Sequence, residues 1–201
     1  MKTVKSLRDR HAQQTTATIL KAATAVFVSD GYALTTIGKI ARKGRVTSGA
    51  IYHHYEDKKD LFQAVAEQVT SQMVSAAASA VTAEKDPWKK LSAGVSAVLS
   101  ASSAPEVKLA FLEAPMVLGL DTWRAIELKH TAPLLTEVLE SLIASKQLSA
   151  AQAPLLGRLL RGVMVEAAMA IAESTNAREA QGHLSSMVDA MIMSLKSARR
   201  R

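Results

Sequence analysis

Residues 35–61 read TTIGKIARKGRVTSGAIYHHYEDKKDL and contain the signals for two short helices joined by a tight turn. Thr36 is a typical N-cap residue, and the apolar residues after it have the spacing of one buried helical face: Ile37, Ile40 and Ala41. Gly44 interrupts this helix, and Thr47 is placed to cap the next one. The pattern predicts a helix-turn-helix, whose second helix is built to lie in the major groove of DNA.

The second helix of this motif carries side chains suited to nucleic acid. Its first turn holds small residues, which let a backbone approach DNA closely, and its last turn holds groups that hydrogen bond to phosphates and base edges. The expected contacts from this helix and its cap are Thr47, Ser48, Gly49, Tyr52, His53 and His54. Asp57 is predicted to cap the next helix, with Lys58 and Lys59 in its first turn, where positive charge opposes the macrodipole. A nearby phosphate would explain both lysines.

Residues 19 to about 65 resemble the TetR family of one-component transcriptional regulators. The matching positions are Ile19, Ala22, Ala23, Phe27, Gly31, Tyr32, Thr35, Thr36, Ile40, Ala41, Val46, Gly49, Ile51, Tyr52, His54, Tyr55, Lys58 and Leu61. The resemblance implies DNA contacts at Thr36, Thr47, Tyr52, His54 and Lys58, and we add Arg45, Ser48 and His53 because we expect them to be exposed.

The chain departs from the family pattern at the turn between the two short helices. It reads Gly44 and then Arg45, whereas the family normally places glycine second. A left-handed Arg45 would cost about 1 kcal/mol relative to glycine. We therefore predict that Arg45→Gly raises the melting temperature.

Composition indicates a globular, all-α protein of about nine helices. The chain has 201 residues, of which 48% are hydrophobic and 21% charged, with 9 Gly and 5 Pro. It has no cysteine, which excludes disulfides and thiolate metal sites. No apolar run reaches the ~18 residues of a membrane span, and there is no apolar signal core, so we expect a cytoplasmic protein.

Charge is distributed unevenly along the chain. Residues 1–60 hold eleven Lys and Arg against five Asp and Glu, whereas residues 61–195 hold ten against thirteen. A basic first part on a mildly acidic body fits a polyanion bound at one end, although scattered solvated lysines would give the same count. We predict a DNA-binding domain at 1–60 and a ligand-binding and dimerisation domain at 61–201.

The last two predicted helices, about residues 149–196, have an apolar stripe too wide for a helix packed on one side. Capping-box patterns at Ser149 and Asn176 begin them. Their surplus apolar surface predicts a homodimer formed by the same hairpin from a second chain. The alternative is a monomer with a larger internal core.

The resemblance also implies a small-molecule pocket in the body. Apolar and adaptable side chains there are the candidates for binding a largely apolar effector: Leu99, Phe111, Met116, Leu120, Trp123, Met164 and Met169. Each of them taken singly also fits an ordinary core position. The polar candidates for orienting a ligand are Glu113, Arg124, His130 and Glu166.

Several smaller expectations concern helix boundaries. A helix from about Thr15 should end at Gly31, with Leu34 filling the core behind it. Residues 115–119 read as an apolar loop, and Asp121 as the cap of the following helix.

Together these features predict a repressor, released from a near-palindromic operator when a small molecule binds the C-terminal domain. The alternative is a helical DNA-binding or interaction module that works without an effector. An enzyme is not indicated, because the chain has no phosphate loop, no HExxH motif and no nucleophile elbow. His53 and His54 point to different sides of a helix and cannot share a metal, so neither a cofactor nor a metal is predicted.

Overall fold

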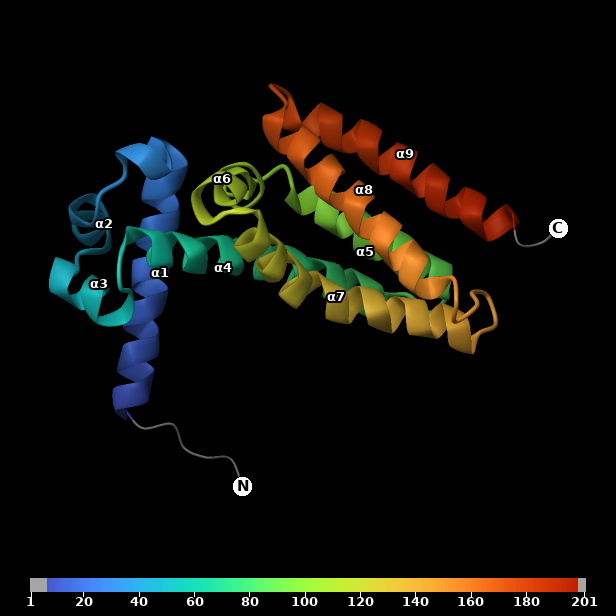
Figure 1. The fold of residues 1–201 in the computed structure, drawn as a ribbon, viewed down its shortest axis with the longest axis horizontal. Coiled ribbons are helices and arrows are strands. Elements are labelled where there is room, and N and C mark those ends of the chain that lie inside the picture. Colours follow the sequence, from blue (N-terminus) through green and yellow to red (C-terminus); the bar gives the residue numbers. More distant parts are fainter. Residues whose placement is uncertain (1–6, 199–201) are drawn as a thin grey trace. The chain divides into compact units, whose positions relative to one another are not determined.

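The computed structural model describes residues 7–198, with side chains described for 12–197. Within that range it contains nine α-helices and one short π-helix and no strand, as the composition predicts (Figure 1). The chain divides into two compact units, residues 1–66 and 67–201. This division falls inside one long helix, whereas the predicted domains meet at residue 60.

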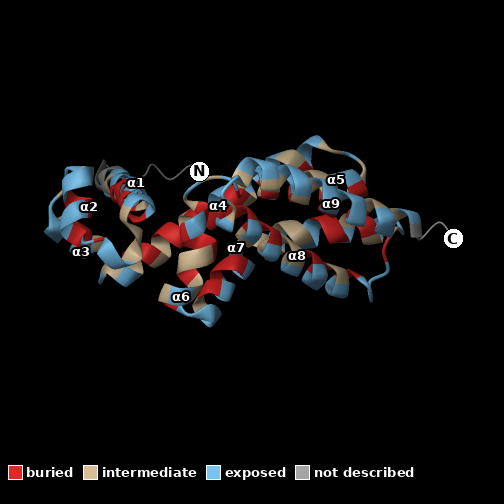
Figure 2. Cartoon of the chain, turned by 90° about the horizontal axis from the view of Figure 1, so that it is seen from above, coloured by how far each residue is buried: buried red, intermediate tan, exposed pale blue. Residues whose placement is uncertain are grey.

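The first unit is a small helical core. It contains α1 (Leu7–Leu34), α2 (Ile37–Gly44), α3 (Ser48–His54) and the start of α4 (Lys58–Ala83). Its fully buried side chains come from all four helices: Ile19, Ala23, Phe27, Ile40, Ile51, Leu61, Phe62 and Val65. The rings of Phe27 and Phe62 meet edge to face with centroids 5.0 Å apart. Figure 2 shows these buried positions on the inner sides of the helices.

Three side-chain caps set where the helices of this unit begin. The hydroxyl of Thr36 accepts the N–H of Lys39 at 3.3 Å, and the hydroxyl of Thr47 accepts the N–H of Ala50 at 3.0 Å. The carboxylate of Asp57 accepts the N–H of Asp60 at 2.8 Å. Each cap satisfies an N–H that the helix itself leaves unpaired, so the three predicted caps are confirmed.

The turn between α2 and α3 explains the order Gly44 then Arg45. A Cβ at Gly44 would lie 3.1 Å from the Cβ of Ala22, so glycine is needed where α2 packs closely against α1. The left-handed conformation therefore falls to Arg45, with φ 53° and ψ 41°. The N–H of Val46 donates to the carbonyl of Ala41 at 3.0 Å and closes the end of α2.

Two expectations about α1 are wrong. The helix begins at Leu7, well before Thr15, and Leu34 is 71% exposed and does not fill the core. Gly31 interrupts the helical backbone with φ 70°, as predicted, and this turns Leu34 outward. The buried place is taken by Thr35, whose hydroxyl donates to the carbonyl of Gly31 at 2.7 Å.

The second unit is a helical bundle with its own core. After the rest of α4 come α5 (Pro87–Ala101), η1 (Leu109–Glu113), α6 (Ala114–Leu118), α7 (Leu120–Ala144), α8 (Ala153–Glu173) and α9 (Ala177–Ala198). Helix α5 contacts α7, α8 and α9, and α8 also contacts α7 and α9. The largest side chains that are fully buried here are Trp88, Leu99, Leu109, Leu142, Ile171 and Ile192. Helices α8 and α9 lie side by side as a hairpin (Figure 1).

Helix boundaries in this unit agree only partly with the sequence reading. The Ser149 capping box forms, since the N–H of Gln152 donates to Ser149 at 3.2 Å and the N–H of Ser149 donates to Gln152 at 3.4 Å, but α8 itself begins only at Ala153. The second box forms only in part: the N–H of Glu179 donates to Asn176 at 3.3 Å, whereas the N–H of Asn176 donates to Ser174. Residues 115–119 are not a loop, because α6 covers most of them and buries Leu118. Asp121 is not a cap, since α7 begins at Leu120 directly after Gly119, whose φ is 89°.

Candidate DNA-binding surface and ligand cavity

Helix α3 has one buried side and one exposed side. Ile51 is fully buried and Tyr55 is buried beyond the helix end, and these residues anchor α3 to the core. The opposite side is open: Thr47, Ser48, Gly49 and His53 are exposed, Tyr52 is 56% exposed, and His54 is half-buried. Thr36, the cap of α2, is exposed as well. The rigid core therefore presents a polar, aromatic helix face to solvent, which is the arrangement a recognition helix needs.

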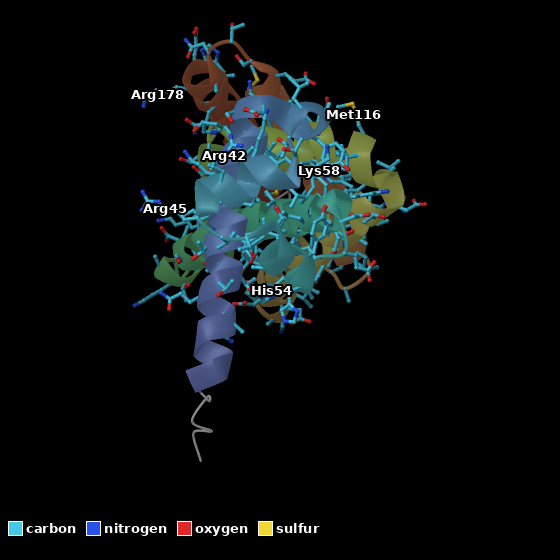
Figure 3. All side chains as sticks on the ribbon, turned by 90° about the vertical axis from the view of Figure 1, so that its left-hand side faces the viewer. Arg42, Arg45, His54, Lys58, Met116 and Arg178 are labelled. Carbon is cyan, nitrogen blue, oxygen red and sulfur yellow. The ribbon has the colours of Figure 1, made fainter. Side chains whose placement is uncertain are left out.

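Basic side chains surround the turn before α3. Arg42 and Lys43 occupy the last turn of α2, and Arg45 follows in the turn itself. All three are exposed, and none of them forms an ion pair within residues 12–197. In Figure 3 Arg45 points away from the ribbon. Unpaired cations beside an exposed polar helix favour contact with phosphates.

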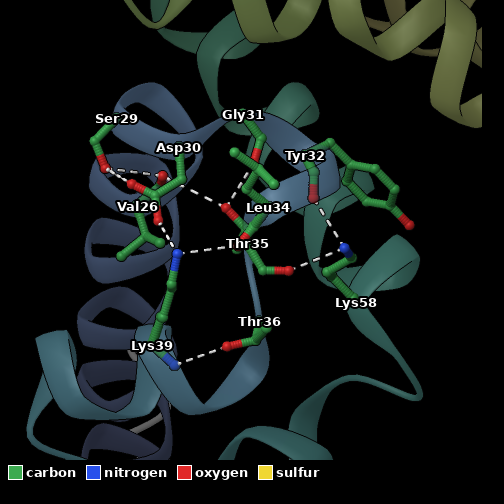
Figure 4. A network of polar contacts seen from close by, with 10 residues as sticks. All are labelled: Val26, Ser29, Asp30, Gly31, Tyr32, Leu34, Thr35, Thr36, Lys39 and Lys58. Atoms are coloured by element: carbon green, nitrogen blue, oxygen red, sulfur yellow. Dashed lines mark hydrogen bonds and ion pairs between the residues drawn. The ribbon is translucent and has the colours of Figure 1, made fainter.

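Lys58 has a role that the sequence does not reveal. Its ammonium donates to the carbonyl oxygens of Tyr32 at 2.8 Å and Thr35 at 2.9 Å, and it lies 4.2 Å from the centre of the Tyr32 ring (Figure 4). A lysine has three N–H donors, so at most one remains for a phosphate. Lys58 therefore ties the start of α4 to the end of α1, and its predicted contact with DNA stays a prediction.

A second lysine, Lys39, also binds at the end of α1. Lys39 pairs with Asp30 and donates to the carbonyl of Leu34 at 3.1 Å (Figure 4). The hydrogen bonds from Lys39 and then Ser29 hold the pKa of the Asp30 carboxyl below its ordinary value. Lys39 and Lys58 thus donate to carbonyl groups at and just after the end of α1, and these bonds tie α2 and α4 to that end.

Residues 67–201 form a mostly apolar cavity of about 70 Å³ that is partly open to solvent, and the space including its open mouth is about 650 Å³. Helices α4, α5, α7 and α8 and the π-helix line it. Two of the predicted ligand-binding residues, Phe111 and Met164, are in its wall. Its charged lining residues are Lys90, Glu127 and Arg161.

The other predicted ligand-binding residues do not line this cavity. Leu99 and Trp123 are core residues, and the indole N–H of Trp123 donates to the carbonyl of Ala110 at 2.7 Å. Met116 and Leu120 are exposed, and Met169 is half-buried. Large apolar side chains fit both a core and a cavity wall, so residue type could not separate the two.

The polar residues of the cavity were missed. The cavity lining includes none of the four polar candidates: Glu113, Arg124, His130 and Glu166. It includes instead Glu127 and Thr131 on α7, where the Thr131 hydroxyl donates to Glu127 at 2.7 Å. One signal was available, since Glu127 follows Trp123 by four residues and therefore falls on the buried face of α7.

Apolar side chains are exposed along α8 and α9. They are Leu155, Leu159, Met187, Met191 and Leu195. Between the two helices lies a groove whose lining includes Leu159, Val163 and Met191. This confirms the prediction that the apolar stripe of the hairpin is wider than its own chain covers.

Comparisons with known proteins agree with these two regions. The family model described as "Bacterial regulatory proteins, tetR family" matches residues 19–65. The model described as "Tetracyclin repressor-like, C-terminal domain" matches residues 88–195, more than half of the chain. The chain belongs to the TetR family. It is a DNA-binding transcriptional regulator, as the resemblance implies.

TetR-family relatives cover nearly the whole chain. The TetC protein of transposon Tn10 from Escherichia coli is 24% identical over 193 residues, which are 96% of this chain and 98% of that protein. The crystal structure of a TetR-family regulator from Pectobacterium atrosepticum has a TM-score of 0.77 and 27% identity, covering 92% and 96% of the two chains. FadR from Bacillus subtilis, solved in complex with stearoyl-CoA, has a TM-score of 0.70 at 19% identity, covering 88% and 96% of the two chains, and shares the fold.

Within residues 7–198, no helix is long and apolar enough to cross a bilayer. The same part of the chain has no group of three His, Cys, Asp or Glu side chains placed to hold a metal ion.

Proposed function

We propose that this TetR-family regulator is a dimeric repressor that releases a near-palindromic operator when a small, largely apolar molecule enters the cavity of residues 67–201. The exposed polar face of α3 is the observation that carries the proposal. Because Ile51 holds α3 on the core, its outer side chains keep a fixed geometry. The operator is chromosomal DNA, so we place the protein in the cytoplasm.

The DNA contacts we propose are those of α3 and its surroundings. Thr47, Ser48, Gly49, Tyr52, His53 and His54 face the major groove, and Thr36, Arg45 and Lys58 face the phosphates. Helix α3 has only seven residues and reaches only a few base pairs. Useful affinity at physiological salt then requires two copies on one duplex, which is why we propose a near-palindromic operator.

The second copy joins through α8 and α9. Five large apolar side chains are exposed on this hairpin, and apolar patches of this kind on a soluble chain mark interaction surfaces. A two-fold axis places the same hairpin of a partner on this patch, so that each copy covers the other. Such an interface would hold the two copies of α3 at a fixed spacing.

The cavity supports an effector. Its mostly apolar wall suits an apolar group, its few polar groups can orient a ligand, and its opening to solvent leaves room for the rest of a small molecule. FadR from Bacillus subtilis holds stearoyl-CoA, which supports the idea that a molecule binds this chain too. An effector that binds the cavity better in one arrangement of the dimer than in another would shift its operator affinity.

The rival proposal is a helical DNA-binding or interaction module that needs no effector. Gel-shift assays with fragments of the source genome, repeated over a range of salt concentrations, test both proposals. We expect a small set of fragments to shift while others do not, with an affinity that falls steeply as salt rises. Equal binding of all fragments at every salt concentration would contradict operator recognition.

A further inference from the structure

Glu127 is unusual among the side chains of residues 12–197. It is 9% exposed and is the only charged residue in the buried part of the described chain. It lines the cavity, where most of its neighbours are aliphatic. Its Oε1 accepts a hydrogen bond from the Thr131 hydroxyl at 2.7 Å. Within the described side chains it forms no ion pair.

A carboxylate in apolar surroundings is strongly destabilised unless a positive group or several donors compensate it. One neutral hydroxyl is a weak compensation. Lys90 and Arg161 also line the cavity, but both are partly exposed, so water solvates their charged ends. Burial therefore destabilises the charge of Glu127 more than the charges of the two cations. Glu127 is then the residue that determines which polar group a bound ligand carries.

Glu127 and Phe111 both line the cavity. The rings of Phe111 and Trp123 meet edge to face with centroids 6.2 Å apart. Glu127 stands one helical turn after Trp123 on the same face of α7. A positive group beside the carboxylate would thus also lie near an aromatic ring, which favours a cation.

The two cations reach the cavity from other helices, Lys90 from α5 and Arg161 from α8. Gly157 of α8 packs against Leu139 and Leu135 of α7, since a Cβ there would lie 2.9 Å and 3.8 Å from their methyl carbons. Helix α8 runs back along α7 (Figure 1), and counting one turn on from Gly157 places Arg161 beside about residue 133 of α7. That position is about 9 Å along α7 from Glu127. Within the described side chains Arg161 forms no ion pair with Glu127, so the carboxylate stays available to a cationic group.

We propose that the effector is an elongated apolar molecule with a protonated amine at one end, and that Glu127 binds this amine. The inference rests on the effector role proposed above for the cavity. The amine nitrogen donates to the Glu127 carboxylate and faces the Phe111 ring, while the apolar body extends between α5, α7 and α8 toward Arg161. Thr131 keeps its hydrogen bond to Glu127 and holds the carboxylate in place.

A matched series of three probes tests this charge preference: 8-phenyloctan-1-amine, 8-phenyloctan-1-ol and 8-phenyloctanoate. Isothermal titration calorimetry on the full chain should give an affinity for the amine about tenfold or more above that for the alcohol, and the carboxylate should bind most weakly. In Glu127→Gln, which keeps the shape and an acceptor for Thr131, the amine should lose this advantage while the alcohol binds as before. Arg161→Gln is the matched control and should leave the amine preference in place.

Three results would overturn the inference: tighter binding of the carboxylate with its loss in Arg161→Gln, equal binding of all three probes, or no binding of the amine. The wild-type comparison needs no variant, so it holds even if Glu127→Gln does not fold. Operator release is measured separately, by anisotropy of labelled DNA with each probe. An amine that binds through Glu127 without releasing DNA supports the cavity chemistry and contradicts the effector role.

Discussion

The two units of this regulator use their helices in opposite ways. In residues 1–66 the core is small and complete, and the side chains proposed to bind DNA stand outside it on α3 and the turn before it. In residues 67–201 the side chains proposed to bind a ligand face inward around a cavity, and the outer face of α8 and α9 is apolar.

This difference determines how each unit responds to substitution. Exposed residues of the first unit support little of its packing, so changing them should alter DNA binding with little change in stability. In the second unit, substitutions of the cavity wall or of the proposed dimer surface should change function and stability together.

The largest effect is expected at the hairpin surface. The double variant Leu159→Glu and Met191→Glu places charges on the two exposed apolar residues that line the α8–α9 groove. Desolvating them in a dimer is costly, so we expect a monomer by light scattering at micromolar concentration and a loss of operator affinity of about a hundredfold or more.

Met116→Glu is the matched control for that variant. Met116 is 78% exposed on α6, and the same apolar-to-acid change there should leave both the dimer and operator binding intact. A double variant that remains a dimer would show that the hairpin surface has another use.

Tyr52→Ala tests the recognition face itself. Tyr52 is exposed on α3 and makes no packing contribution comparable to Ile51. A lost base or phosphate contact is worth about 1–3 kcal/mol, so operator affinity should fall about tenfold or more, measured by fluorescence anisotropy. Dimerisation and melting temperature should stay as in the wild type. A fall in dimerisation would show that Tyr52 supports the fold and does not read DNA.

Arg45→Gly should change stability and DNA binding in opposite directions. Glycine removes the left-handed strain at φ 53°, worth about 1 kcal/mol, so the melting temperature should rise by about 2–4 °C. Operator affinity should fall, and the salt dependence of binding should lose about one phosphate contact. Arg178→Ala, at an exposed arginine of α9, should change neither quantity. An unchanged or lower melting temperature for Arg45→Gly would show that the turn tolerates arginine without strain.

The smallest effect concerns Asp86, the N-cap of α5. The backbone N–H of Lys89, and then the ammonium of Lys196, lower the pKa of this carboxyl from its ordinary value of 3.8. A lowered pKa in the folded state contributes stability above the ordinary pKa, and this stability is lost as pH falls through the folded pKa. Asp86→Asn keeps a capping oxygen, so we expect a melting temperature lower by about 2 °C at most at pH 7. Thermal melts over a pH series should show this difference shrinking as pH falls below 3.8 and through the lower pKa of the folded state; a constant difference would contradict the assignment.

Local chemistry explains why the first unit could be predicted in detail. Thr36, Thr47 and Asp57 each satisfy an N–H three residues ahead, so sequence spacing alone determines where their helices begin. The left-handed conformation of Arg45 follows from the family pattern, because the family normally places glycine at this position of the turn. Leu34 was misplaced because Gly31 changes the direction of the chain by a backbone angle that the sequence permits without specifying it.

Tertiary packing decides the corresponding details of the second unit. Residues 115–119 look like a loop because they contain Pro115 and Gly119, yet burial of Leu118 holds most of them in α6. The cavity wall combines residues from helices far apart in sequence, so no single periodic pattern identifies Glu127 as a cavity residue and Trp123 as core. Their helical positions are equivalent, and only the neighbouring elements distinguish them.

The central claim is that two copies of α3 occupy successive major grooves of one near-palindromic operator. Methylation-protection footprinting of a selected genomic fragment tests it directly. We expect two protected major-groove patches, related by two-fold symmetry and spaced about 34 Å, one turn of DNA, or a multiple of that distance, and both patches should be lost in Tyr52→Ala. A single protected patch, or protection confined to the minor groove, would contradict the claim.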